Sequence, residues 1–131
     1  MRTRPAWWVR DQYRYERVHA DELAVEISCR LMDRLVRVRE EYRVQVVVGM
    51  QYGAAEAAGK APPWYGPPVL ECAKGRGFKT VDTYPPLKAL ADQDPRRFSG
   101  LWVNEGGQLG HMSAAGNGLI AALYRDVLVT R

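Results

Sequence analysis

The sequence predicts an α/β fold, a three-layer sandwich in which a partial, flavodoxin-like parallel sheet is flanked by helices. Two adjoining segments lead to this prediction. A stretch with helical periodicity at 21–42 runs directly into VQVVVGM at 44–50, which is β-branched and almost continuously apolar. Strands buried on both faces of a parallel sheet have this composition, and a helix followed by such a strand is half of a βαβ unit. The length of 131 residues fits a single domain, 1–131.

The first element, from about Asp21 to Tyr42, carries an apolar residue every three or four positions, which predicts an amphipathic helix. Charged residues fill its other faces. We expect the apolar stripe to cover a flat apolar surface of the domain. The stripe consists of Leu23, Ile27, Leu31, Leu35, Val38 and Tyr42.

The N-terminal segment 1–18, MRTRPAWWVRDQYRYERV, holds two Trp, two Tyr and five Arg without a clear period. We interpret it as an aromatic, basic arm that packs on the domain or on another subunit. The alternative is an arm that stacks on single-stranded nucleic acid. The net charge is +4, but acidic residues alternate with basic ones through the first 43 positions, so we do not expect a nucleic-acid partner.

The segments after the apolar strand continue the α/β pattern. Residues 51–68, rich in Gly, Ala and Pro, predict a long loop that is either functional or a plain surface excursion. PPVLECAKGRGF predicts a short helix, FKTVD a strand that ends at Asp82, and TYPPLKALADQDP a helix that stops before Pro95. Residues 96–110 are expected to form a loop, and Ser113 to cap a last helix at about 114–127.

The composition excludes several classes of protein. No apolar run reaches the roughly 20 residues that span a bilayer, so we expect no membrane partner. Cys29 and Cys72 are two isolated thiols, which we expect to be reduced and structural rather than paired. No Cys/His cluster or phosphate loop occurs, so we expect neither a metal nor a cofactor. A cytoplasmic location is the resulting expectation.

The last block of the chain, GHMSAAGNGLIAAL at 110–123, places a histidine and a serine just before an apolar helical run. It resembles the final block of the SGNH (GDSL-type) hydrolases, in which a catalytic histidine precedes a small turn and the last helix. Two further segments, LAVEISCRLMDRLVRVREEYRVQVVVGMQYG and VLECAKGRGFKTVDTYPPLKAL, are similar to the late helices and strands of that family. The resemblance covers the C-terminal half of a family domain.

The resemblance implies a serine esterase or acyl hydrolase in which His111 is the general base. The sequence also departs from the family. It has no Gly-Asp-Ser nucleophile motif and no Gly-x-Asn-Asp block, both of which belong to the N-terminal half of the family domain. The aspartate that precedes the family's histidine is replaced by Gln108 or Leu109. Since a serine needs a base and the base needs an orienting acceptor, we expect the chain to be weakly active or inactive alone.

Alternatives to catalysis remain open for each of these residues. His111 is either the base of a site that another chain completes or a loop residue without chemistry. Ser113 is expected to be a helix cap and Asp82 a turn or cap residue. For the chain as a whole there are three hypotheses. It is an incomplete acyl-ester hydrolase domain, a non-catalytic interaction module, or a nucleic-acid-associated protein. In the first two cases we expect a homo-oligomer or a partner chain, because an incomplete sheet leaves an exposed edge.

Overall fold

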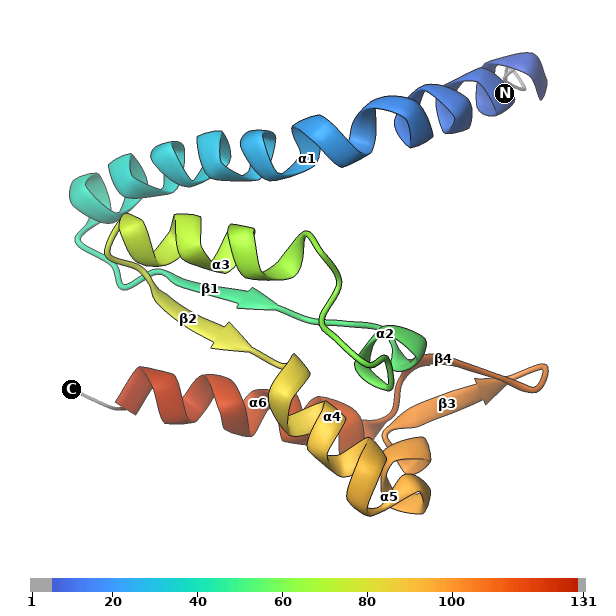
Figure 1. The fold of residues 1–131 in the computed structure, drawn as a ribbon. Helices are drawn as coiled ribbons and strands as arrows, with labels where there is room; N and C mark the ends of the chain where they lie inside the picture. Colours follow the sequence, from blue (N-terminus) through green and yellow to red (C-terminus); the bar gives the residue numbers. More distant parts are fainter. Residues whose placement is uncertain (1–5, 130–131) are drawn as a thin grey trace, which may run out of the picture.

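The computed structural model describes residues 6–129, and residues 1–5 and 130–131 lie outside the description. Helices and strands are interspersed along the chain (Figure 1). The helices are α1 (Ala6–Tyr42), α2 (Ala54–Ala57), α3 (Gly66–Gly75), α4 (Tyr84–Gln93), α5 (Pro95–Gly100) and α6 (Ala114–Val129). The strands are β1 (Val47–Met50), β2 (Lys79–Asp82), β3 (Trp102–Glu105) and β4 (Gln108–Met112).

Strands β1 and β2 pair in parallel, from Val47 opposite Lys79 to Met50 opposite Asp82, with α3 as the crossover. Prolines stand at the start of α3, and Gly77, at φ +73°, turns the chain into β2. Val48 belongs to an apolar cluster with residues of α1 and α3, whereas Gly49 lies against Tyr124 of α6. Because neighbouring strand residues point to opposite faces, helices cover both faces of this sheet. The predicted α/β class is confirmed. The βαβ unit consists of β1, α3 and β2, whereas the sequence assigned the helix at 21–42 and the strand that follows it to half of such a unit.

A β-hairpin occupies the segment that was expected to be a loop. Strands β3 and β4 are antiparallel, and the turn between them is Gly106–Gly107, with φ of +62° and +88°. Two positive φ angles are what a tight hairpin turn requires, and glycine adopts them without steric cost. The prediction of a loop over 96–110 was therefore wrong, and α5, which begins at Pro95, also covers the first five residues of that range.

Helix α1 begins at Ala6, well before the expected start at Asp21. The backbone of residues 6–18, assigned to the N-terminal arm, is therefore helical, while residues 1–5 of that arm lie outside the described residues. Among residues 23–42 of α1, whose side chains the structure describes, Met32 is the buried one, and it clusters with Ala73 and Phe78. The predicted apolar stripe lies on a different face of α1 from Met32, and all six of its residues are exposed. The expectation that it covers a flat apolar surface of this chain was wrong.

Cys29 of α1 and Cys72 of α3 form a disulfide, with Cα atoms 5.6 Å apart. The expectation of two reduced thiols was wrong, because α1 packs on α3 and brings together residues separated by 43 positions. Such bonds are rare in cytoplasmic proteins, so the disulfide weighs against the expected cytoplasmic location. That location remains a prediction.

A second and larger core lies at the carboxyl end of the sheet. Tyr52, Leu87 and Trp102 are buried there, contributed by the segment after β1, by α4 and by β3. Met112 of β4 packs against this cluster. The hairpin is thereby fixed beside the end of the sheet, and its position sets that of His111.

Candidate functional site

His111 lies on β4 and its side chain is exposed. The neighbouring Met112 is partly buried against the larger core and pairs with Trp102 across the hairpin. Since successive side chains of a strand point to opposite faces, Met112 anchors the strand and His111 points away from the core. The imidazole makes no hydrogen bond or ion pair with any of the side chains that the structure describes, which are those of residues 23–104 and 106–129. It is accessible to a ligand and has no orienting acceptor there.

The strand that carries His111 lies next to the carboxyl end of β1. Gln51 directly follows β1, and its amide nitrogen Nε2 is 3.3 Å from Sδ of Met112. Ligands of open α/β sheets bind outside the carboxyl ends of the parallel strands. The tertiary structure therefore brings β4, the strand that carries His111, to the edge where chemistry is expected in such folds, through a contact between residues 61 positions apart.

Ser113 is the N-cap of α6, as the sequence predicts. Its Oγ accepts a hydrogen bond from the Gly116 amide at 3.2 Å and donates one to the Gly100 carbonyl at 2.8 Å. Both bonds hold the hydroxyl in the cap geometry. Ser113 is thus a structural residue that joins α6 to the end of α5, and it is not available as a nucleophile.

Asp82 ends β2 and accepts a hydrogen bond from the Tyr84 amide at 2.9 Å, at the start of α4. The next residue, Thr83, is fully buried and donates from Oγ1 to the Met50 carbonyl at 2.9 Å. The prediction that Asp82 is a turn or cap residue is confirmed. Among the described residues, the structure does not bring His111, Ser113 and Asp82 into a hydrogen-bonded triad.

The long segment after β1 packs into the core instead of forming a free loop. Glu56 accepts hydrogen bonds from the Gly53 amide at 2.8 Å and from the Tyr65 hydroxyl at 2.6 Å. Burial, together with this bond to Glu56, raises the pKa of Tyr65 to about 12. Burial and the nearby charges of Asp82 and Glu56 raise the pKa of Tyr52 to about 12. Both phenols stay protonated near neutral pH and cannot act as bases.

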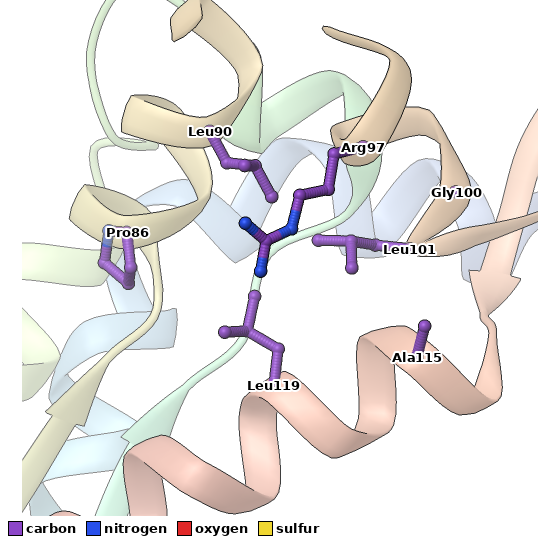
Figure 2. A pocket seen from close by; sticks show the side chains of 7 residues that line it. All are labelled: Pro86, Leu90, Arg97, Gly100, Leu101, Ala115 and Leu119. Atoms are coloured by element: carbon purple, nitrogen blue, oxygen red, sulfur yellow. The ribbon is translucent and has the colours of Figure 1, made fainter. Parts of the chain in front are cut away.

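A groove of about 480 Å³ lies between α4, α5 and α6 (Figure 2). Its lining is mostly apolar, and Figure 2 shows the Arg97 guanidinium among Leu90, Leu101 and Leu119. Among the groups that the structure describes, this guanidinium has no carboxylate or carbonyl partner. The arrangement can hold an apolar group beside an anion. The lining residues are Pro86, Leu90, Arg97, Gly100, Leu101, Ala115 and Leu119.

Sequence reasoning missed Arg97, because the pattern of 96–110 gave no helix and hence no groove wall. The dipeptide Asp94–Pro95 was a usable signal: Asp94 accepts from the Arg97 amide at 3.0 Å, and a proline follows at the first helical position. With that helix recognised, Arg97 would have been placed one turn from Leu101.

Other kinds of site find no support in the described part of the chain. It contains no group of three or more His, Cys, Asp or Glu side chains suited to a metal ion. None of its helices combines the length and apolarity needed to cross a bilayer. No family model, curated protein or solved structure matches this chain.

Proposed function

We propose that this chain supplies the general base of an SGNH-like acyl-ester hydrolase, and that the base is His111. The observation that carries the proposal is the position of this exposed histidine, ahead of the capped α6 and beside the carboxyl end of β1. The resemblance of GHMSAAGNGLIAAL to the family's last block supports it. On this proposal, β1 and β2 are part of a flavodoxin-like, three-layer sandwich.

The serine nucleophile of this site comes from outside the described residues. Ser113 is occupied as a cap, and the parallel sheet contains only β1 and β2 in the part of the chain described. Two strands are fewer than a stable parallel sheet has, and each leaves one unpaired edge. Val47 and Val48, from a segment expected to be buried on both faces, are only half-buried. Additional strands from a second polypeptide segment would cover them and bring the nucleophile.

In the completed site His111 would take the proton from the serine hydroxyl as that oxygen attacks the ester carbonyl. The same imidazole would then protonate the departing alkoxide, and in the second half-reaction it would activate water against the acyl-enzyme. Without an acceptor at Gln108 or Leu109, the orienting carboxylate and the oxyanion donors must come from the added segment. The product is a carboxylic acid.

The test is ester hydrolysis by the chain as it exists in its own cells. The tagged chain, purified with whatever it binds, should hydrolyse p-nitrophenyl acetate or butyrate. His111→Ala should lower the rate about a thousandfold or more, since triad members act as a unit. His19→Ala, which replaces the other histidine, is the matched control and should leave the rate unchanged. No turnover in the wild type, or equal turnover in His111→Ala, would overturn the proposal.

A non-catalytic interaction module is the second candidate, and the exposed apolar stripe of α1 favours it. In that case His111 is a surface residue of the hairpin without chemistry. The same preparation separates the two candidates, because a pure interaction module retains its bound partner but hydrolyses no ester in either variant.

A further inference from the structure

Helix α1 presents a continuous row of exposed apolar side chains. The exposed fractions of Leu23, Ile27, Leu31, Leu35, Val38 and Tyr42 lie between 37% and 64%. Monomeric proteins rarely leave a contiguous apolar row of this length in water. Single exposed leucines are ordinary, but six at consecutive helical turns form one surface, which we name the α1 stripe.

The α1 stripe is not the side of the helix that holds the domain together. Cys29, Met32 and Val36 face α3, through the disulfide and the smaller apolar cluster. At 100° per residue, the centre of the α1 stripe lies roughly 130° around the helix from these three residues. α1 therefore has two apolar faces, and the described residues cover only one of them.

We propose that the α1 stripe pairs in parallel with the α1 stripe of a second copy of this chain. The spacings along the stripe, of four and three residues, keep its six side chains on one face of α1, which a second helix can cover. The six side chains offer on the order of 500 Å² per copy, so a pair buries roughly 1,000 Å², which a specific interface requires. This pairing does not depend on the proposed catalysis.

The length of α1 supports a second helix as the occupant. α1 has 37 residues, which corresponds to about 55 Å. Figure 1 shows its N-terminal part continuing beyond α3, away from the other helices. Helices in water depend on packing of an apolar face for most of their stability. A second α1 is a partner of equal length, whereas a small ligand or a short peptide would cover only part of it.

The charges beside the stripe select the parallel orientation. One flank carries Arg30, Arg34 and Arg37 between Glu26 and Glu41, and the other carries Ser28 and Arg39. In an antiparallel pair centred on the stripe, Arg30 would face Arg37 of the other copy and the two glutamates would face each other. In a parallel pair the first flank faces the second, where the one charge is Arg39. Arg39 is turned toward the Arg76 carbonyl and the Phe78 ring of its own copy, so fewer like charges meet.

The first test measures the mass of the chain in solution by sedimentation equilibrium. The wild type should be a dimer at micromolar concentration. The double variant Ile27→Gln, Leu31→Gln should dissociate at least tenfold more readily. Glu40→Gln, on the opposite side of the same helix, is the matched control and should remain dimeric. Because Ile27 and Leu31 are about half exposed in one copy, circular dichroism should show an unchanged fold.

The second test distinguishes the orientation. Leu23→Cys should form a disulfide-linked dimer on mild oxidation, because residue 23 meets its own counterpart in a parallel pair. Glu40→Cys, on the opposite side of α1, should not. An antiparallel pair would hold the two residues 23 about 28 Å apart and give no cross-link.

Three results would overturn the proposal. A wild type that is monomeric at every concentration contradicts it directly, as does a dimer that the double variant leaves intact. A wild type that is monomeric and sediments with anionic lipid vesicles would assign the stripe to a membrane surface instead, if the double variant no longer binds the vesicles.

Discussion

Tyr52 and Tyr84 are packed edge to face in the larger core, with ring centroids 5.8 Å apart, but their hydroxyls differ. The Tyr84 hydroxyl donates to the Gly59 carbonyl at 2.8 Å. The Tyr52 hydroxyl is buried against Gly66 and has no hydrogen-bond partner among the described residues. A buried hydroxyl without a hydrogen-bond partner lowers the stability of the fold, whereas a hydrogen-bonded one raises it. One aromatic pair thus contains two opposite contributions to stability.

Replacing each tyrosine by phenylalanine should separate these contributions. Tyr52→Phe should raise the free energy of unfolding by about 1 kcal/mol, because it removes an unpaired buried group. Tyr84→Phe should lower it by about 1 kcal/mol, because the Gly59 carbonyl loses its donor. Urea denaturation measures both. Equal losses in the two variants would mean that the Tyr52 hydroxyl has a partner in solution.

The ion pair between Asp33 and Arg76 joins α1 to the end of α3, with Oδ1 and Nε 2.6 Å apart. This hydrogen bond holds the pKa of Asp33 below its ordinary value of 3.8. A carboxylate with a lowered folded-state pKa stabilises the fold above its unfolded pKa. That stabilisation is lost as the pH falls through the folded-state value.

The contribution of Asp33 to the melting temperature should therefore be complete above about pH 4 and should shrink as the pH falls below that value. Asp33→Asn should melt lower than the wild type near pH 6, and the gap should narrow steadily as the solution is made more acidic than about pH 4. Because Asp33 is exposed, the gap should be small. Glu40→Gln, an exposed carboxylate of the same helix, is the control and should show no such gap. A gap of the same size at every pH would indicate a packing effect instead.

At the scale of elements, α6 packs closely enough on the end of α5 to require a glycine. A Cβ atom at Gly116 would lie 2.3 Å from the Leu101 carbonyl oxygen, which also accepts a hydrogen bond from the Ser113 amide at 2.8 Å. Two residues later on the same helix, a Cβ at Gly118 would meet no atom within 4 Å. Only the first glycine is needed for packing.

Alanine at these two positions should have opposite effects. Gly116→Ala should lower the free energy of unfolding by about 2–3 kcal/mol, because backbone must move to admit the methyl group. Gly118→Ala should raise it by about 0.5–1 kcal/mol through helix propensity. Thermal and urea unfolding provide the comparison. If both variants were more stable than the wild type, the contact of α6 with Leu101 would be looser than described.

Elements with strong local signals were predicted, and those that depend on pairing were missed. The proline-led starts of α3 and α4 and the cap of α6 follow from residues within one turn, so their prediction succeeded. The hairpin was missed although Gly106–Gly107 is a good turn signal, because β3 and β4 are short and lack a clear alternation of apolar and polar residues.

At the scale of the whole molecule, α1 is fastened to the rest by a few specific contacts. Besides the disulfide and the Asp33 ion pair, Arg39 donates to the Arg76 carbonyl at 2.9 Å and lies over the Phe78 ring, 5.1 Å from its centroid. The apolar cluster beneath α1 is small, with three buried residues. The disulfide is therefore a large part of what holds α1 in place.

Removing the disulfide should lower the free energy of unfolding by about 2–4 kcal/mol. The double variant Cys29→Ala, Cys72→Ala and the reduced wild type should agree, since both release the same loop. Urea denaturation with and without reductant gives the difference. The unreduced protein should show no free thiol after denaturation, and finding two thiols would contradict the bond.

The candidate site was predicted in part. The sequence selected His111 and the cap role of Ser113, because both belong to one local block. It did not predict the groove that Arg97 lines, nor the contact between Gln51 and Met112, because both join segments from distant parts of the chain. Spacing along the sequence does not encode such neighbours.

The sequence by itself determined the α/β class and the helices α3, α4 and α6, because prolines, caps and periodicity act within a few residues. Only the tertiary structure decided which face of α1 is buried. The helical period places both Met32 and the α1 stripe on apolar faces, and packing on α3 selected the first. Tertiary packing also paired the cysteines and set His111 at the end of β1, because these contacts depend on how the elements meet in space.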